Sequence, residues 1–127
     1  KLERFEWEIA QRLALGERYG RLLAGATAVR LLEVRPDRDC VWAQYTVFVE
    51  NRTAVQAALA QAGIPTAVHY PKPLHHQPAY AALCCPDCCP ASVAASERVM
   101  SLPMSADLTH AQQDRVVAAL LLATSEA

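Results

Sequence analysis

The sequence predicts an α+β domain of two layers, in which a long N-terminal helix and further helices pack on one face of a small, mostly antiparallel sheet. Three observations support this fold class. Helical and strand-like patterns are interleaved along the chain but do not alternate strictly. A length of 127 residues suits one domain and leaves little room for a second. Hydrophobic residues make up 53% of the chain, so one domain-sized core can form.

A long helix opens the chain and is expected to end near Gly25, a residue type that favours the C′ position. Glu8 with Arg12, and Glu17 with Arg21, have the i,i+4 spacing of ion pairs on a solvent-exposed helix face. Apolar residues recur at every third or fourth position, which indicates one buried face. This predicted face contains Leu2, Phe5, Ile9, Leu13, Leu22 and Leu23.

Two strands are expected after this helix. Residues 29–34 form a short apolar run, and the polar residues 36–39 then form a turn. Residues 41–49, VWAQYTVFV, are rich in β-branched and aromatic side chains and make the strongest strand in the chain. Because side chains alternate along a strand, it has two faces. One face contains Trp42, Gln44, Thr46 and Phe48, and the other contains Ala43, Tyr45, Val47 and Val49.

A second helix is expected to begin after a cap at Asn51 or Thr53 and to end at Gly63. Residues 66–70 then read as a third strand, which runs directly into a cluster of prolines. The buried face of the helix is expected to contain Val55, Leu59 and Ala62.

The last third of the chain predicts a helix from Pro90 to about Met100, because proline favours the first position of a helix. Residues 101–104, SLPM, form a short extended piece. Thr109 and Gln112 have the spacing of a capping box, which starts the last helix. The buried face of that helix contains Val116, Val117, Leu120 and Leu121.

The charge pattern excludes two classes of partner. The net charge is −1 and charges of both signs are interspersed, whereas a nucleic-acid backbone binder needs a basic surplus. No apolar run approaches the roughly 20 residues of a membrane span. We therefore expect neither nucleic acid nor membrane as a partner. The five cysteines, an odd number without a secretory signal, favour a reducing cytoplasm over a disulfide framework.

The chain lacks the sequence motifs that would indicate catalysis by this chain alone. The chain has no glycine-rich phosphate loop and no GxSxG elbow. A Schiff-base enzyme needs a desolvated lysine, but Lys1 is terminal and Lys72 lies between two prolines. We therefore assign no catalytic or cofactor-binding residue in this chain. Since the first residue is not methionine and already lies in a helical pattern, we expect the chain to be a piece of a longer protein.

The segment CCPDCC, residues 84–89, has two competing interpretations. Cys85 and Cys88 have CxxC spacing, and His75 or His76 would complete a zinc knuckle. A structural zinc site usually has two well-separated ligand pairs, and the second pair is missing here. The favoured interpretation is a cysteine-rich loop without a metal, and the alternative is a zinc-binding interaction module.

The segment GIPTAVHYPKPLHHQPAY, residues 63–80, is the main candidate site. His69 and Tyr70 end the expected strand at a corner that prolines make stiff, and His75 follows Leu74, which is able to anchor the loop. Binding groups are commonly held where strands run into rigid loops. An imidazole and a phenol at such a corner suit a polyhydroxylated or phosphorylated ligand. The alternative is a rigid connection whose histidines cap backbone groups.

This segment resembles the GI-x-T-x-x-HYP-x-PLH-x-QPAY segment of the DegT–DnrJ–StrS family of sugar-nucleotide aminotransferases. Three further segments are similar to that family in the same order. Residues 1–25 resemble its long helix after the cofactor domain, and residues 41–64 resemble its W-x-x-Y strand with the following helix. Residues 97–120 resemble its closing SLPM segment. The resemblance covers nearly the whole chain, although the cysteine cluster departs from it.

The resemblance implies the fold of type I pyridoxal phosphate enzymes. In that fold a large domain holds the cofactor and its Schiff-base lysine, and a smaller C-terminal domain closes over an active site at a homodimer interface. Residues 1–127 then correspond to the small domain alone. The pyridoxal phosphate of the full-length enzyme would be bound by the absent domain, and none by this chain.

The resemblance also implies the substrate and its contacts. The family moves an amino group, usually from glutamate, to a keto group of a nucleotide sugar. His69 and Tyr70 match the His-Tyr pair that approaches the sugar nucleotide, and His75 matches the PLH histidine. The segments WAQYT and IPTAVHYP are most similar to transaminases that aminate carbon 3 of a UDP-linked 2-acetamido-2-deoxy-3-oxo-glucuronate. Such enzymes act in the synthesis of surface polysaccharide or O-antigen. A structural domain needed only for dimerisation or folding is a further alternative.

Overall fold

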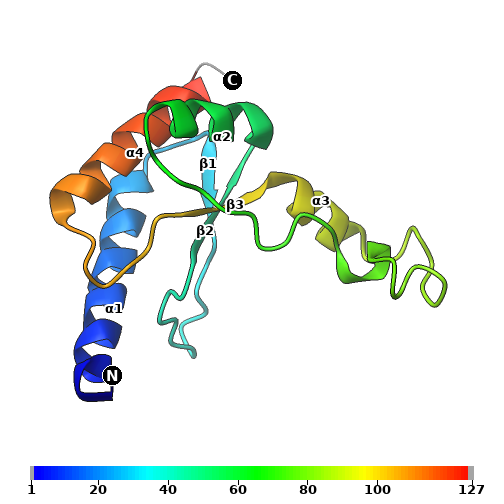
Figure 1. The fold of residues 1–127 in the computed structure, drawn as a ribbon, viewed down its shortest axis with the longest axis horizontal. Coiled ribbons are helices and arrows are strands. Elements are labelled where there is room, and N and C mark those ends of the chain that lie inside the picture. The colour runs from blue at the N-terminus through cyan, green and yellow to red at the C-terminus, as the bar shows by residue number, and fades with distance from the viewer. Residues whose placement is uncertain (1, 126–127) are drawn as a thin grey trace.

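The computed structural model describes residues 2–125 as a three-stranded antiparallel sheet with four α-helices (Figure 1). The strands lie in the order β1-β2-β3, which confirms the predicted α+β class. In chain order the elements are η1 Leu2–Arg4, α1 Phe5–Leu23, β1 Val29–Leu31, β2 Tyr45–Val49, α2 Arg52–Gln61, η2 Leu74–His76, α3 Pro90–Arg98, β3 Val99–Leu102 and α4 His110–Ser125.

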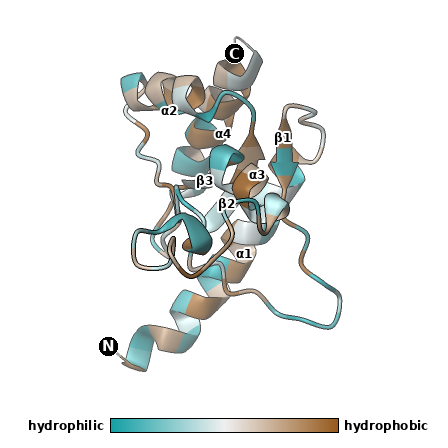
Figure 2. Cartoon of the chain, turned by 90° about the vertical axis from the view of Figure 1, so that its right-hand side faces the viewer, coloured by the Kyte–Doolittle hydropathy of each residue, from teal (hydrophilic) through white to brown (hydrophobic). Residues whose placement is uncertain are grey.

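Helices α1, α2 and α4 form the layer that encloses the core, whereas α3 lies on the other side of the sheet and carries the cysteine loop away from it (Figures 1 and 2). Between this layer and the sheet the apolar side chains are removed from water, which stabilises the fold. The largest fully buried apolar side chains are Tyr19, Leu23, Leu59, Met100, Leu120, Val47, Val49 and Val55.

The predicted buried face of α1 is wrong over its first half. Leu2 is 85% exposed, and Phe5 and Leu13 are also exposed. Leu23 is buried as predicted, and the other buried residues of α1 are Leu15, Gly16 and Tyr19. Only the second half of α1 lies against the sheet, while the first half extends past it (Figure 1).

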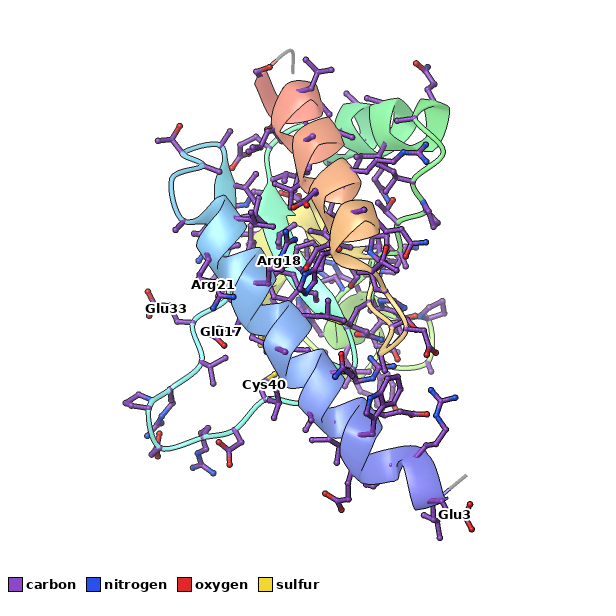
Figure 3. The ribbon with its side chains drawn as sticks, turned by 90° about the vertical axis from the view of Figure 1, so that its left-hand side faces the viewer. Glu3, Glu17, Arg18, Arg21, Glu33 and Cys40 are labelled. Carbon is purple, nitrogen blue, oxygen red and sulfur yellow. A yellow bond between two sulfur atoms is a disulfide. The ribbon has the colours of Figure 1, made fainter. Side chains whose placement is uncertain are left out.

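Of the two ion pairs expected on α1, the structure contains one. Arg21 and Glu17 form the i,i+4 pair on the exposed side of the helix (Figure 3). Arg12 donates to the carbonyl oxygen of Trp42 at 3.1 Å. It therefore ties α1 to the segment before β2.

The alternation predicted for β2 is confirmed where the strand forms. Tyr45, Val47 and Val49 face the core and are buried. Residues 41–44 are not strand, and Trp42 has a positive φ of 50°. A φ in this region turns the chain out of the extended conformation, so β2 begins later than the sequence pattern indicates.

The strand predicted at residues 66–70 is reduced to one bridge, in which Ala67 pairs with Ser101 of β3. Its amide donates to the Ser101 carbonyl at 3.2 Å and its carbonyl accepts from the Ser101 amide at 2.7 Å. Pro65 and Pro71 flank this segment and lack the N–H groups that a longer ladder would use. The segment is thus fastened at a single residue.

The helix boundaries mostly follow the sequence signals. Gly63 has a φ of 72° and follows α2, as expected of a helix stop. The predicted capping box is present: the Thr109 amide donates to Gln112 Oε1 at 2.9 Å, and the Gln112 amide donates to Thr109 Oγ1 at 3.2 Å. Ala62 and Leu121 were expected to be buried but are exposed. No helix among residues 2–125 is long and apolar enough to cross a membrane.

Candidate functional site

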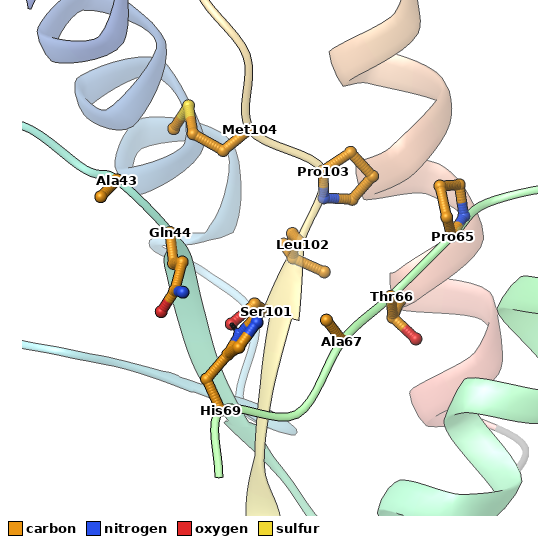
Figure 4. A pocket seen from close by; sticks show the side chains of 10 residues that line it. All are labelled: Ala43, Gln44, Pro65, Thr66, Ala67, His69, Ser101, Leu102, Pro103 and Met104. Carbon is orange, nitrogen blue, oxygen red and sulfur yellow. Dashed lines mark hydrogen bonds between the residues drawn. The ribbon is translucent and has the colours of Figure 1, made fainter.

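A hollow of about 280 Å³ lies where the ends of β2 and β3 meet the segment between Pro65 and His69 (Figure 4). One wall comes from Ala43 and Gln44, just before β2, and the opposite wall comes from the proline-flanked segment. The residues that line it are Ala43, Gln44, Pro65, Thr66, Ala67, His69, Ser101, Leu102, Pro103 and Met104.

His69 is fixed at the rim of this hollow by a short chain of hydrogen-bonding groups. Its Nδ1 lies 3.2 Å from the hydroxyl oxygen of Ser101 (Figure 4). The Ser101 hydroxyl lies in turn 3.0 Å from the hydroxyl oxygen of Thr46. Among residues 2–125, Nε2 of His69 has no hydrogen-bond partner. One nitrogen of the imidazole is therefore held by the sheet and the other is available to a ligand.

The sheet register explains why these groups meet. Thr46 of β2 and Ser101 of β3 are directly paired, so both hydroxyls lie on the same face of the sheet. The bridge between Ala67 and Ser101 fixes the backbone of the segment between Pro65 and Pro71 beside β3. His69 follows Ala67 by two residues. Ser101 is 5% exposed, so its hydroxyl depends on these protein partners for its hydrogen bonds.

Three aromatic rings, from α1, β2 and the segment before β2, form a column. The ring centroids of Tyr19 and Tyr45 are 4.8 Å apart, and those of Tyr45 and Trp42 are also 4.8 Å apart. The Tyr19 hydroxyl donates to the carbonyl oxygen of Pro103 at 2.9 Å. Because Pro103 lines the hollow, this bond ties its wall to α1.

The tyrosines of this column are held as neutral phenols. Burial raises the pKa of Tyr19 well above its ordinary value, and the neighbouring Tyr45 phenol adds to the rise, whereas Arg18 opposes it. Burial also raises the pKa of Tyr45. The Tyr19 hydroxyl therefore keeps the proton that it donates to Pro103.

The other two site residues expected from the sequence lie outside the hollow. Tyr70 is 75% exposed, and its ring lies edge-on to His69 with centroids 6.1 Å apart. The His69–Tyr70 peptide bond is cis. His75 is only 9% exposed and lies in η2 beside His76, with ring centroids 4.2 Å apart. Its Nε2 is buried without a hydrogen-bond partner in the described part of the chain.

Three residues of this site were not selected from the sequence. Ser101 supports His69 directly, Thr46 supports Ser101, and Gln44 lines the hollow next to them. The alternation of residues 41–49 already placed Gln44 and Thr46 on one strand face. The missing signal was the pairing of that face with Ser101.

The described residues do not fit pyridoxal phosphate as a resident cofactor. That group is held through a desolvated lysine, and Lys72 is the one lysine within residues 2–125. It is exposed between two prolines, and its carbonyl oxygen accepts from Gln77 Nε2 at 3.3 Å. Lys72 also does not line the hollow.

The cysteine loop contains a disulfide between Cys85 and Cys88. Cys40, Cys84 and Cys89 are free. His76 Nε2 lies 2.8 Å from the carbonyl oxygen of Pro86, which connects the loop to η2. Over the part of the chain that the structure describes, no group of three or more His, Cys, Asp or Glu residues is arranged to hold a metal ion.

Comparison with known protein families gives one match over most of the chain. The sequence pattern of the DegT/DnrJ/EryC1/StrS aminotransferase family matches residues 1–121. The chain is also similar to UDP-2-acetamido-2-deoxy-3-oxo-D-glucuronate aminotransferase from Pseudomonas aeruginosa. The two are 42% identical over 120 residues, which are 94% of this chain and 33% of that protein.

Solved structures have the same fold as this chain. The crystal structure of Streptomyces venezuelae DesV in complex with a ketimine intermediate has a TM-score of 0.88 and 34% identity, and the match covers 95% of this chain and 33% of DesV. The PLP form of Spr1654 from Streptococcus pneumoniae has a TM-score of 0.86 and 25% identity, and the match covers 98% of this chain and 33% of Spr1654. The chain thus spans about a third of the length of these relatives.

Proposed function

The chain belongs to the DegT/DnrJ/EryC1/StrS aminotransferase family, and from this premise we propose that residues 1–127 are the C-terminal small domain of a sugar aminotransferase. The full-length enzyme, here called the parent protein, moves an amino group from glutamate to a keto group of a nucleotide sugar. The family match over residues 1–121 is the observation that carries the proposal. The likeness to about a third of each relative supports the role of a single domain.

Exposed apolar side chains on α1 support the presence of a large domain in the parent protein. The first half of this helix extends past the sheet (Figure 1), and its apolar residues have no core to enter. A contiguous exposed apolar surface usually marks an interaction site. The large exposed hydrophobic residues are Leu2, Phe5, Trp7 and Leu13 in η1 and the first half of α1, and Leu22 near the end of α1.

The substrate that we propose is a UDP-linked 2-acetamido-2-deoxy-3-oxo-glucuronate, which is aminated at carbon 3. The 42% identity with the Pseudomonas aeruginosa enzyme supports this choice. The alternative within the family is another nucleotide sugar or amination at another carbon. We place the reaction in the cytoplasm and in the synthesis of surface polysaccharide or O-antigen, with a homodimeric parent protein, on the family resemblance.

We assign the contact with the nucleotide sugar to His69, Tyr70 and His75. His69 has the best support, because its Nε2 has no hydrogen-bond partner among residues 2–125 while its Nδ1 is held by Ser101 at the rim of the hollow. The exposed phenol of Tyr70 adjoins it. The buried Nε2 of His75 lacks a partner among residues 2–125, and such atoms are normally hydrogen-bonded in a complete protein. A substrate or a second domain would supply that partner.

In the parent protein pyridoxal phosphate, bound by the large domain, supplies the electron sink for amino transfer. The small domain contributes orientation. Imidazole and phenol groups donate hydrogen bonds to hydroxyl, carboxylate or phosphate oxygens of the nucleotide sugar. The hollow beside them restricts how the sugar lies. Orientation of this kind lowers the barrier because it removes the entropy cost of bringing reacting groups together.

The direct test is amino transfer by the purified parent protein with pyridoxal phosphate, glutamate and the UDP-linked 3-oxo sugar. We expect mass spectrometry to show that the keto oxygen of the sugar is replaced by an amino group while glutamate becomes 2-oxoglutarate. The isolated 127-residue chain serves as the control and should give no product. If the parent protein transfers no amino group from glutamate to any of the family's keto sugars, the proposal fails.

A further inference from the structure

We propose that Ser101 is a positioning residue for His69, and that Thr46 orients the Ser101 hydroxyl. The inference rests on the proposed function, since it concerns the imidazole that we assign to the nucleotide sugar. It adds two residues from the sheet, Ser101 and Thr46, which act through His69. Their role is to fix both the direction of the imidazole and the nitrogen that carries its proton.

The geometry suits a relay of hydrogen bonds in one direction. Each hydroxyl has a single proton to donate but is able to accept as well. If Thr46 donates to Ser101 across 3.0 Å, then Ser101 donates to Nδ1 of His69 across 3.2 Å. Nδ1 is then an acceptor and the neutral imidazole carries its proton on Nε2. The bond made by one ring nitrogen thus selects the tautomer presented by the other.

The relay is anchored in the hydrogen-bonded sheet. Thr46 and Ser101 are paired residues of two hydrogen-bonded strands. The backbone of Ser101 is bonded in both directions to Ala67, and its side chain is 5% exposed. His69 itself is exposed. Without the Ser101 bond its ring would be free to rotate, since no other hydrogen bond holds it among residues 2–125.

The tautomer matters for the ligand that the site is proposed to take. A nucleotide sugar presents hydroxyl, carboxylate and phosphate oxygens, and the charged ones accept hydrogen bonds only. An imidazole with its proton on Nε2 donates to such oxygens. The opposite tautomer would turn a lone pair towards them and would repel a carboxylate or phosphate. Ser101 therefore acts on substrate affinity through His69.

The test uses steady-state kinetics of the parent protein with the UDP-linked 3-oxo sugar. We expect Ser101→Ala to raise the KM for the sugar about three- to tenfold, the range of one lost hydrogen bond. The KM for glutamate should stay unchanged. Thr46→Val should produce a smaller rise in the same parameter, and Thr46→Ser, which keeps the hydroxyl, should restore the wild-type value. Ser96→Ala is the matched control, because Ser96 is a buried serine whose hydroxyl donates to a backbone carbonyl in α3.

A double variant separates positioning from a merely structural effect. If Ser101 acts through His69, then Ser101→Ala adds nothing to the sugar KM once His69→Ala is present. If the two effects add, or if Ser101→Ala raises both KM values alike, the positioning role is overturned. Should Ser101→Ala fail to fold, the Thr46→Val and Thr46→Ser pair decides the question in the same way.

The contact between His69 and the sugar can be tested separately from the positioning of His69 by Ser101. If His69→Ala leaves the sugar KM unchanged, the contact between His69 and the sugar is wrong and the role of Ser101 is overturned with it. If His69→Ala raises the sugar KM but Ser101→Ala and Thr46→Val do not, the proposed function stands and only the relay is refuted.

Discussion

Nδ1 of His69 lies 3.2 Å from the hydroxyl of Ser101, although the two residues are 32 positions apart in the chain. This contact connects the segment between Pro65 and Pro71 to β3, an edge strand of the sheet. The imidazole is consequently oriented by β3, while its own segment is fastened only at Ala67. A binding group on an irregular segment is held by a strand in this way.

Gly16 is predicted to be intolerant of a side chain. A Cβ atom at this position would lie 2.2 Å from Cδ1 of Trp42, so the indole would have to leave the column that it forms with Tyr45. We expect Gly16→Ala to lower the free energy of unfolding by about 1–3 kcal/mol, a typical cost of overpacking. Denaturant unfolding followed by tryptophan fluorescence would measure it.

Gly20, one turn later on α1, is the matched control. A Cβ atom there would meet only the Tyr45 hydroxyl, at 3.9 Å, which is an ordinary contact. Because alanine is the better helix former, Gly20→Ala should be neutral or stabilise the chain by up to about 1 kcal/mol. Equal effects of the two substitutions would show that Trp42 does not rest on Gly16.

The buried phenols predict a loss of stability at high pH. The pKa values of Tyr19 and Tyr45 are raised in the folded chain above the ordinary value of 10.0. At a pH above 10 the unfolded chain has lost these protons while the folded chain still holds them. The stabilisation is therefore complete below about pH 10 and declines as the pH rises from there towards the raised folded values.

The measurement is the free energy of unfolding as a function of pH, from about pH 8 to about pH 11. Tyr19→Phe should flatten the decline above pH 10, although it also removes the hydrogen bond to Pro103 and so lowers stability at every pH. Tyr80→Phe changes an exposed phenol and should leave the decline as in the wild type. A Tyr19→Phe curve that runs parallel to the wild-type curve would refute the assignment.

The capping box at the start of α4 predicts a moderate stability effect. Thr109→Ala removes the oxygen that accepts from the Gln112 amide. We expect it to lower the free energy of unfolding by about 1 kcal/mol. Thr109→Ser keeps the acceptor and should retain most of the stability. If serine and alanine at this position are equivalent in denaturant unfolding, the cap contributes nothing.

The cysteine loop is predicted to be separate from sugar recognition. Neither Cys85 nor Cys88 lines the hollow, so Cys85→Ser in the parent protein should leave the KM for the nucleotide sugar unchanged. Thiol titration of the unreduced chain should detect the free cysteines Cys40, Cys84 and Cys89. Stoichiometric zinc that is lost together with the fold on chelation would instead favour the zinc-module interpretation.

Local patterns predicted the fold well where neighbouring residues decide the structure. The alternation of Tyr45, Val47 and Val49 predicted the buried face of β2, and the spacing of Thr109 and Gln112 predicted the cap of α4. The pattern failed where distant contacts decide. Periodicity along α1 cannot show that the sheet covers only its second half, which is why Leu2 and Phe5 were expected to be buried.

The candidate site could be predicted only in part for the same reason. His69 was selected because prolines surround it, which is a local signal. Ser101 and Thr46 support it through the pairing of β2 with β3, and strand register over such a distance is not readable from one sequence. The placement of Tyr70 and His75 outside the hollow likewise depends on how the segment folds beyond Ala67.

The most direct test of the central claim compares the two half-reactions of the parent protein in wild type and in His69→Ala. The first half-reaction uses glutamate alone, and the second uses the UDP-linked 3-oxo sugar. We predict that His69→Ala leaves the glutamate half-reaction unchanged and raises the sugar concentration for half-maximal rate about tenfold, as expected for one strong hydrogen bond. Equal effects on both half-reactions, or no effect on the second, would contradict the assignment of this domain to sugar recognition.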